Sequence, residues 1–347
     1  MSTVLGLLTL AAMMLFTLGT GQAVAGHVQC GDVITQDTTL DSDLTCSGDG
    51  LTVTGNGVAV DLAGHTIEGA GSATGILDLA DDTEVLGGTI RGFGTGVGAD
   101  GPAGLLVHHV LIHDNGAGVA CAYAPACSVT DSTLRDNGIG IRMSAPDGGS
   151  FLRTFVRRNH VHHNGAGVSL IEYLATVTDN RIEDNSGRGV DMDNTARVAM
   201  SRNVVAGNRE DGVVVRFLSS ATISSNRIER NGGNGVAVIG DLFFGNTSAV
   251  VQGNRIMRNG GDGVLVEAEG AHAVVERNRT DRNGDDGIDV NAAATAPAEA
   301  IDTLVRANRA FFNTDLGIDA VAGTTDGGGN RANQNGDSAQ CVGVVCK

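Results

Sequence analysis

The sequence predicts an all-β protein in which about 11–12 short coils stack as a right-handed parallel β-helix solenoid. Three observations predict this fold class. A Gly-Val or Gly-Ile dipeptide recurs with a base period of 21–24 residues, and pairs of asparagine recur at the same period. The composition combines 52 glycines with only 3% aromatic residues and no Trp, which favours short strands and tight turns over a conventional globular core.

The dipeptide repeat sets the number and length of the coils. Eleven copies are spaced by 21–24 residues, except for three longer steps of 27, 28 and 30 residues. The copies begin at Gly75, Gly96, Gly118, Gly140, Gly167, Gly189, Gly212, Gly235, Gly263, Gly287 and Gly317. A fixed period of this length is the signature of a solenoid.

The fuller repeat is Asn-x-Ile-x-x-Asn, then a Gly-rich turn, then Gly-Val-x-Val. Ile182, Ile228 and Ile256 are expected to point inward from one short strand, because alternate residues of a strand face opposite sides. The repeat glycine is expected to supply the positive φ of a corner. The Val-x-Val segment forms the next strand, with its middle residue outward.

The paired asparagines indicate ladders that run along the stack. They recur at Asn180/Asn185, Asn203/Asn208, Asn226/Asn231 and Asn254/Asn259. Stacked coils place like residues roughly 4.8 Å apart, and each amide can bond to the copies on either side. A leucine-rich repeat has a similar length, but its L-x-x-L-x-L-x-x-N frame is absent.

The two ends differ from the repeat and predict the domain boundaries. Residues 1–25 have the features of a signal peptide, with an apolar run followed by an Ala-x-Ala cleavage site. This predicts export to the periplasm or the extracellular space. Residues 26–50 are expected to form an N-terminal cap, 51–325 the β-helix and 326–347 a C-terminal cap, because open solenoid ends need covering.

The six cysteines form three close pairs in the sequence, which are Cys30–Cys46, Cys121–Cys127 and Cys341–Cys346. An even number of cysteines behind an export signal favours disulfides. Sequence neighbours are the expected partners, although six cysteines allow 15 connectivities. Zinc is the alternative, but these spacings do not match common zinc frames.

The charge narrows the classes of partner. The net charge is −17, the pI is near 4.7 and the only lysine is Lys347. An acidic surface argues against nucleic acid and anionic lipid as partners, and the N-terminal apolar run is short for a membrane-spanning helix. A polyanionic ligand would need local arginine or a bound cation.

The opening of the expected mature chain resembles bacterial secreted right-handed β-helix repeat proteins. The similar segments are residues 30–35 (CGDVIT), 43–46 (DLTC) and 60–67 (VDLAGHTI), followed by the Asn-x-Ile-x-x-Asn units. The resemblance covers nearly the whole mature chain and implies the pectin-lyase-like superfamily. That superfamily includes polysaccharide lyases, glycoside hydrolases, alginate epimerases and non-catalytic proteins, so the fold leaves the activity open. The motifs of its polygalacturonases, pectate lyases and epimerases are missing.

The longer coils predict where a working face would lie. Their extra residues follow the Val-x-Val strand at 144–150, 240–248 and 292–300, and the loop between Cys121 and Cys127 occupies the same corner. Insertions on one side of a solenoid border its binding face.

The outward positions beside that corner give the first candidate site. Asp191 and Asp193 should share one strand face, with Arg216 one coil away. Residues i and i+2 of a strand are roughly 6.6–6.8 Å apart, within the roughly 6.5–9.5 Å of an acid/base pair in inverting glycoside hydrolysis. Arg216 could bind a uronate carboxylate. The alternative is a solvated cross-coil salt bridge. The candidate substrate-binding residues near this corner are Arg142, Glu172, Tyr173 and Phe217.

Histidines form a second candidate. Alignment of the coils places His113, Arg135 and His162 in one column, where they could move a proton or bind an oxyanion. The alternative is surface pairing along the ladder.

Calcium is the one cofactor that the sequence suggests. The segment that contains Asp285, Asp286 and Asp289 partly resembles a calcium-binding β-roll repeat, although only one imperfect copy exists.

Two functions remain open on the sequence alone. One is an extracellular enzyme that acts on polysaccharide as a lyase, epimerase or hydrolase. The other is a non-catalytic surface scaffold or glycan-binding protein. The oligomeric state is not determined by the sequence.

Overall fold

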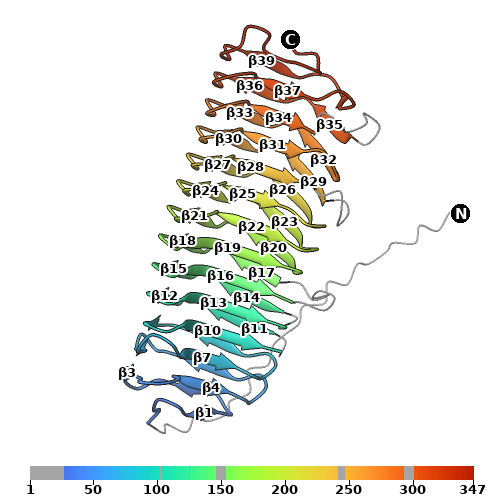
Figure 1. Cartoon of the computed structure of the whole chain (residues 1–347). Helices are drawn as coiled ribbons and strands as arrows, with labels where there is room; N and C mark the ends of the chain where they lie inside the picture. The colour runs from blue at the N-terminus through green and yellow to red at the C-terminus, as the bar shows by residue number, and fades with distance from the viewer. Residues whose placement is uncertain (1–26, 102–103, 125, 146–153, 241–246, 293–300) are drawn as a thin grey trace, which may run out of the picture.

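The computed structural model is a parallel β-solenoid built from three sheets, A, B and C, each of 13 strands within the described part of the chain. The structure describes residues 27–101, 104–124, 126–145, 154–240, 247–292 and 301–347. Every pairing between neighbouring coils is parallel (for example β19 with β22). At the parallel-strand spacing of roughly 4.8 Å, 13 coils give a rod roughly 60 Å long (Figure 1).

Sheet A carries the Gly-Val-x-Val strands and lies on the face that holds the candidate acidic residues. Its strands are β1 (Val33–Ile34), β4 (Leu51–Val53), β7 (Thr74–Asp78), β10 (Thr95–Asp100), β13 (Ala117–Ala122), β16 (Ile139–Ser144), β19 (Ala166–Ile171), β22 (Val190–Asp193), β25 (Val213–Val215), β28 (Val236–Ile239), β31 (Val264–Glu267), β34 (Ile288–Asn291) and β37 (Ile318–Ala320).

Sheet B follows sheet A in every coil. Its strands are β2 (Thr38–Thr39), β5 (Ala59–Asp61), β8 (Glu84–Leu86), β11 (Leu105–His108), β14 (Cys127–Thr130), β17 (Thr154–Arg157), β20 (Leu174–Thr178), β23 (Arg197–Ser201), β26 (Ser220–Ser224), β29 (Thr247–Gln252), β32 (Ala271–Glu276), β35 (Asp302–Arg306) and β38 (Thr325–Asp326). The stretches that the structure leaves undescribed between 102 and 300 all fall between a strand of sheet A and the next strand of sheet B. The predicted insertions at 144–150, 240–248 and 292–300 therefore lie at this corner in chain order, and most of their residues lie outside the described ones.

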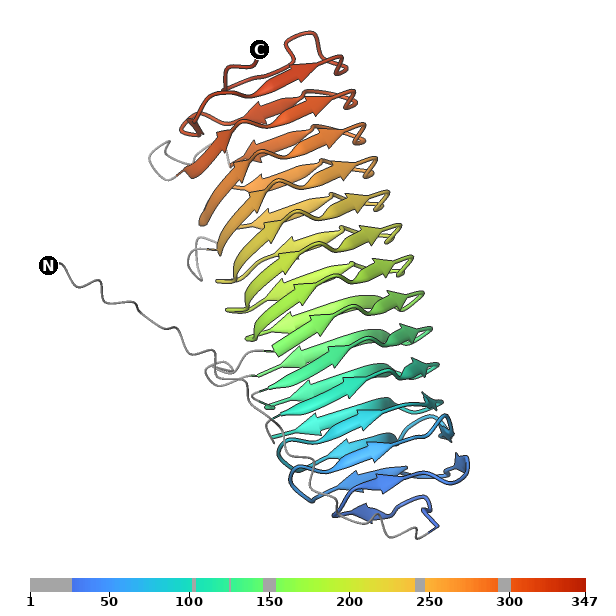
Figure 2. The same ribbon diagram turned by 180° about the vertical axis from the view of Figure 1, so that it is seen from behind.

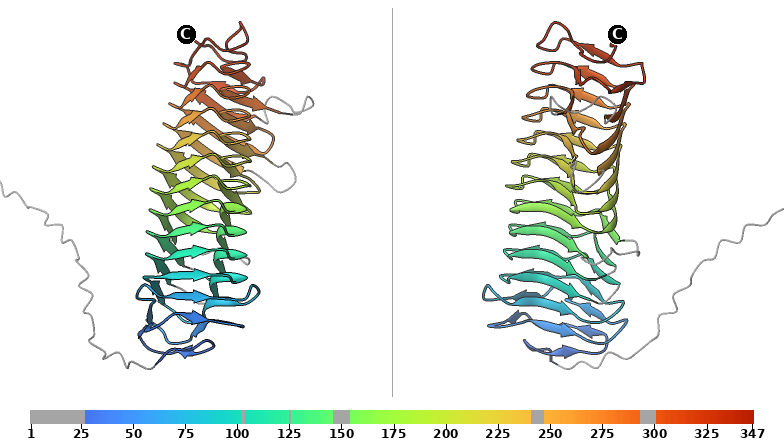
Figure 3. Two further views of the ribbon diagram at one scale, coloured as in Figure 1. Left: turned by 90° about the vertical axis from the view of Figure 1, so that its left-hand side faces the viewer. Right: turned by 45° about the vertical axis from the view of Figure 1, so that its right-hand side comes forward.

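Sheet C carries the Asn-x-Ile strands. Its strands are β3 (Leu44–Thr45), β6 (Thr66–Glu68), β9 (Thr89–Arg91), β12 (Leu111–His113), β15 (Thr133–Arg135), β18 (His160–His162), β21 (Arg181–Glu183), β24 (Val204–Ala206), β27 (Arg227–Glu229), β30 (Arg255–Met257), β33 (Arg279–Asp281), β36 (Arg309–Phe311) and β39 (Arg331–Asn333). Ile182, Ile228 and Ile256 are fully buried, as the period-two alternation predicts. Strands of successive coils lie side by side along the stack in the views from behind and from the side (Figures 2 and 3).

Two asparagine ladders run through the stack and confirm the prediction from the repeat. The Asn180 side-chain Nδ2 donates to the Oδ1 of Asn203 at 2.9 Å, and the Asn203 Nδ2 donates to the Oδ1 of Asn226 at 3.0 Å. Most of these amides also donate to a backbone carbonyl of the preceding coil, as Asn203 does to Val177 at 2.8 Å. These buried amides therefore have partners for both donors and for the oxygen, which is what burial of a polar group requires.

The repeat glycines act differently from the prediction. Gly189 and Gly212 do not have positive φ; a Cβ on Gly189 would lie 2.6 Å from the carbonyl oxygen of Gly212. These glycines are therefore required by the close approach of successive coils. The left-handed corners lie at the residue before a ladder asparagine. This residue is a glycine in some coils, such as Gly207 (φ 67°), and a non-glycine residue in others, such as Asp184 (φ 53°) and Arg202 (φ 57°). The prediction of positive φ at the repeat glycine was wrong, because backbone contact between coils imposes the constraint there.

The three predicted disulfides are all present, as Cys30–Cys46, Cys121–Cys127 and Cys341–Cys346, and no described cysteine is free. The first lies in the segment predicted as the N-terminal cap, which also contributes the strands β1, β2 and β3 to the sheets. Three disulfides are typical of proteins outside the reducing cytoplasm. Within the described residues, no helix is long and apolar enough to cross a membrane.

Candidate functional site

Asp191 and Asp193 project from the outer face of β22, and Arg216 follows β25 on the next coil. The stacking brings the three together: the Arg216 Nη2 lies 3.0 Å from the Asp191 Oδ2 and 2.9 Å from the Asp193 Oδ2. Arg188, which sequence analysis did not single out, donates to Asp191 at 3.0 Å from the start of the same coil. All four side chains are 19–30% exposed, so they form a partly desolvated cluster.

This geometry corrects two details of the sequence hypothesis. Because both carboxylate oxygens contact the same Nη2 atom, they are closer together than the roughly 6.5–9.5 Å of an inverting pair. Arg216 also bridges the two carboxylates of its own chain, so in this conformation it is not an unpaired cation. Alternation along the strand fixed the shared face of Asp191 and Asp193, but the side-chain positions depend on the arginine of the next coil.

Burial raises the pKa of Asp193 above its ordinary value, and the charge of Asp191 adds to the rise while Arg216 opposes it. A carboxyl group with a raised pKa beside a second carboxylate is the arrangement that enzymes use to separate acid and base roles. The cluster therefore contains a carboxyl group that holds its proton to higher pH than an ordinary aspartate, as a proton-exchanging group requires.

The predicted substrate-binding residues divide into a surface group and a core residue. Arg142 is exposed on β16, two strands before β22 in sheet A. Glu172 accepts a hydrogen bond from Asn194, and the Arg216 guanidinium lies 5.3 Å from the centre of the Phe217 ring. Tyr173 is only 1% exposed and its hydroxyl donates to the carbonyl of Ala124. The expectation that Tyr173 contacts substrate was wrong, because its ring fills the interior beneath the corner.

The predicted column of His113, Arg135 and His162 is present in the pairing register of sheet C. Its members pair mainly within their own coils. His113 contacts Asp114 at 2.6 Å, and Arg135 pairs with Asp136. The ring of His162 stacks on that of His160, and burial together with neighbouring histidines lowers the pKa of His162. This arrangement matches the surface-pairing alternative. The contacts of the described residues do not join His113, Arg135 and His162 in one site.

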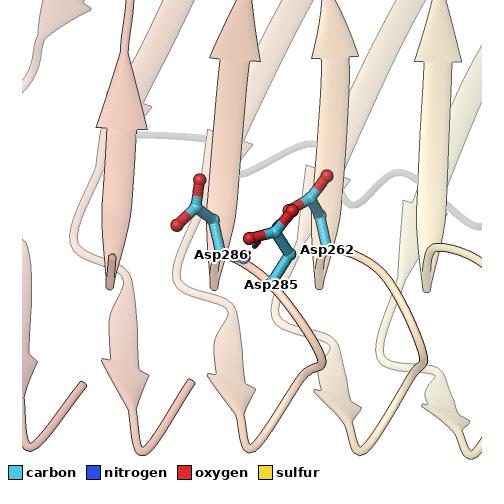
Figure 4. Close-up of side chains that lie close together, drawn as sticks. All are labelled: Asp262, Asp285 and Asp286. Carbon is cyan, nitrogen blue, oxygen red and sulfur yellow. Dashed lines mark hydrogen bonds between the residues drawn. The ribbon is translucent and has the colours of Figure 1, made fainter. Parts of the chain in front are cut away.

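A second acidic cluster lies on sheet A near the C-terminal end. The carboxylate oxygens of Asp262, Asp285 and Asp286, whose side chains Figure 4 shows, lie within 4.8 Å of one another. Those of Asp286, Asp289 and Asp319 also lie within 4.8 Å of one another. The sequence predicts a group of Asp285, Asp286 and Asp289. Asp262 was missed, although it precedes Gly263 as Asp286 precedes Gly287, so alignment of the dipeptide repeats could have found it.

The closely spaced carboxylates of this cluster favour either protonation or the binding of a cation. The pKa values of Asp262 and Asp286 are raised to about 7. Burial is the main cause, and the charges of neighbouring carboxylates contribute to the rise. The pKa of Asp289 rises to about 6 for the same reasons. Several carboxylate oxygens at this spacing are the ligand type that calcium prefers. The residues present therefore fit the predicted ion. Asp286 belongs to both groups, so it would hold the ion either with Asp262 and Asp285 or with Asp289 and Asp319.

Comparison with known proteins bears on the fold. Residues 140–310 match the family model described as the right handed beta helix region. No curated protein matches the chain.

Several solved structures are similar to the chain. The Dettilon tailspike protein matches with a TM-score of 0.50 and 14% identity, covering 90% of this chain and 61% of its own. The periplasmic alginate epimerase AlgG matches with a TM-score of 0.45 and 15% identity, covering 84% and 72%. The A-module of the Azotobacter vinelandii mannuronan C-5 epimerase AlgE4 gives 0.41 and 14%, covering 91% and 87%. At these identities the likeness concerns the fold alone. The match of residues 140–310 to that family model and the three parallel sheets agree on the fold, a parallel β-helix.

Proposed function

We propose that this protein acts on a polysaccharide outside the cytoplasm, at the outer face of sheet A, and that Asp193 exchanges a proton with the sugar. The observation that carries the proposal is the partly buried cluster in which Asp191 and Asp193 share Arg216. Hydrolases, lyases and epimerases all need a group that gives or takes a proton at the sugar.

Each member of the cluster has a role in this proposal. Asp193 is the proton-exchanging group, since burial raises its pKa toward neutrality. Asp191 contacts both Arg188 and Arg216, so those two side chains hold its carboxylate in place beside the reacting sugar. When substrate binds, Arg216 is the residue placed to exchange one of its carboxylate partners for an acidic group of the sugar, because guanidinium binds carboxylates in a bidentate manner.

The disulfides support the location in this proposal, because they persist in oxidising compartments. Export by residues 1–25 remains a prediction, since those residues lie outside the described part of the chain. We also propose calcium as the ion for the acidic cluster around Asp286, held with Asp262 and Asp285 or with Asp289 and Asp319. It would neutralise carboxylates that otherwise repel an acidic polymer.

The second candidate function is a non-catalytic glycan-binding scaffold. One observation favours it: Arg216 already neutralises both carboxylates, which is what a structural cross-coil salt bridge would do.

The test is a polysaccharide panel that includes uronate-rich and neutral glycans, with products read by mass spectrometry and by proton exchange from deuterated water. New oligosaccharides or deuterium incorporation would support the enzyme, and the Asp193→Asn variant should then reduce turnover by roughly 100-fold or more. Asp184→Asn, at an exposed corner on the other side of the coil, is the matched control. Turnover that survives in Asp193→Asn would remove this residue from the reaction. Binding without any product would favour the scaffold.

A further inference from the structure

The outer face of sheet B contrasts with the charge of the chain. Across seven successive strands, β11, β14, β17, β20, β23, β26 and β29, no residue is Asp or Glu. The whole chain nevertheless has 40 acidic residues and a net charge of −17. The acid-free stretch is bounded by Glu84 on β8 and by Glu276 on β32.

Two shallow grooves lie on this stretch of sheet B. The first, of about 330 Å³, crosses β11, β14 and β17 and is lined by Ser128, Phe155 and Arg157 among others. The second, of about 260 Å³, crosses β20, β23 and β26 and is lined by Thr176, Arg197 and Thr222 among others. Since β17 pairs directly with β20, the grooves lie on consecutive coils of one face.

Each groove contains an arginine that forms no ion pair among the described residues. Arg157 and Arg197 are both exposed on outward positions of their strands. Arg157 influences Asp179 at the next corner electrostatically, but Asp179 forms its ion pair with Arg202 at 2.8 Å. Most arginines near carboxylates elsewhere in the coils are paired, so these two are available to an external anion.

The remaining lining suits a sugar polymer. Phe155 presents an exposed ring, 39% accessible, between the hydroxyl-bearing Ser128 and Thr176 in the same register column. A flat apolar ring next to hydroxyl groups offers both a stacking surface and hydrogen-bond partners. The two arginines are separated by two coils and about four residues along the strands, roughly 10 Å by roughly 13 Å. A ligand that contacts both must therefore be longer than one sugar.

We propose that the outer face of sheet B is a second binding surface, separate from the sheet A site, that holds an acidic polysaccharide across Arg157, Phe155 and Arg197. Carboxylates of the polymer would pair with the two guanidiniums, and the sugar rings would lie over Phe155 and the small side chains between them. Nucleic acid is disfavoured, because the groove offers one aromatic ring where single-stranded nucleic-acid sites use several.

The test uses the full mature chain and polygalacturonate as the probe, with binding followed by isothermal titration calorimetry. The double variant Arg157→Ala/Arg197→Ala should bind roughly tenfold more weakly or worse, because it loses two charge-assisted contacts. Arg309→Ala/Arg331→Ala is the matched control, since it removes the same charge from outward positions of sheet C and should stay within about twofold. Circular dichroism and thermal melting check that both double variants fold.

Three outcomes would overturn the proposal: an unchanged affinity in Arg157→Ala/Arg197→Ala, an equal loss in the control pair, or equally tight binding of neutral dextran. Equal affinity for a single-stranded polynucleotide would also overturn it, by showing general attraction of polyanions. Asp193→Asn separates this proposal from the sheet A function. It should retain polygalacturonate binding whether or not it abolishes turnover, so either proposal can fail alone.

Discussion

The outer faces of sheets A and B are built by the same coils, yet they differ in charge. Sheet A carries the clusters around Asp193 and Asp286, whereas seven consecutive strands of sheet B carry no acidic residue. The interior cannot explain the difference, because both sheets bury the same kind of small aliphatic side chains. The contrast teaches that in a solenoid the inward positions specify the fold, while the outward positions are free to specify function.

Removal of the Arg216 guanidinium from the sheet A cluster should have the largest effect on the difference between the two sheets. In Arg216→Gln, Asp191 and Asp193 would lie close together without their bridging guanidinium, so turnover should fall by roughly 100-fold or more. Thermal stability should fall more at pH 8 than at pH 5, because repulsion between the carboxylates requires both to be ionised. Arg309→Gln is the charge-matched control. A variant with full turnover and an unchanged melting temperature would show that Arg216 is a passive surface pair.

Calcium should stabilise the acidic end of sheet A. If the ion binds only the folded protein, a calcium concentration of 100 times Kd should add about 2.7 kcal/mol to the free energy of unfolding. Differential scanning calorimetry with calcium, magnesium and chelator measures this. Asp286→Asn/Asp289→Asn should remove the calcium response, while Asp184→Asn should keep it. A melting temperature that is insensitive to calcium would exclude the predicted ion.

Without calcium, the same cluster should make the protein more stable in mild acid. The pKa values of Asp262 and Asp286 are raised to about 7 from 3.8, so the folded protein holds protons that the unfolded chain releases. This contribution is fully present below about pH 4 and is lost as the pH rises through about 7. The melting temperature of the chelator-treated protein should therefore fall by several degrees between pH 5 and pH 8. The Asp262→Asn/Asp286→Asn variant should flatten that slope, and an equal slope in this variant would assign the pH dependence to other groups.

An acidic side chain added to sheet B should make it resemble sheet A. Thr222 lies on an outward position in the second groove. Thr222→Glu should weaken polygalacturonate binding roughly fivefold through like-charge repulsion, whereas Thr222→Gln, of the same size, should leave it nearly unchanged. The difference should shrink at high salt. Equal affinities of the two variants at low salt would contradict an electrostatic role for this face.

The smallest expected effect tests the corrected role of Tyr173. Tyr173→Phe removes the buried hydroxyl that donates to Ala124 and should cost about 1 kcal/mol of stability in urea unfolding. It should leave polysaccharide binding and turnover unchanged, because the ring is in the core. A loss of turnover without a loss of stability would return Tyr173 to the site.

Much of the fold was predictable because the same pattern of inward, outward and ladder residues recurs in each coil. The inward Ile182 and Ile228, the ladder through Asn203 and the three disulfides all follow from residue type and period. The reason for glycine at Gly189 was not predictable from one coil, since its neighbour is the backbone of another coil.

The candidate sites were only partly predictable. The shared face of Asp191 and Asp193 follows from alternation along a strand, and the group of Asp285, Asp286 and Asp289 follows from proximity in the sequence. The contribution of Asp262 depends on the register between coils 24 residues apart, and the bridging position of Arg216 depends on its side-chain conformation.

By itself, the sequence determined a disulfide-pinned parallel solenoid with an acidic surface, because period, residue alternation and composition act locally and repeat in every coil. Only the tertiary structure decided which charges meet. It placed Arg216 between two carboxylates, gathered five aspartates from three coils, buried Tyr173 and left Arg157 and Arg197 unpaired on sheet B. The physical reason is that the deciding partners lie one coil away, as Arg216 and Asp191 do at 25 residues along the chain. The register and insertion lengths that bring them together are set by the stacking of the coils.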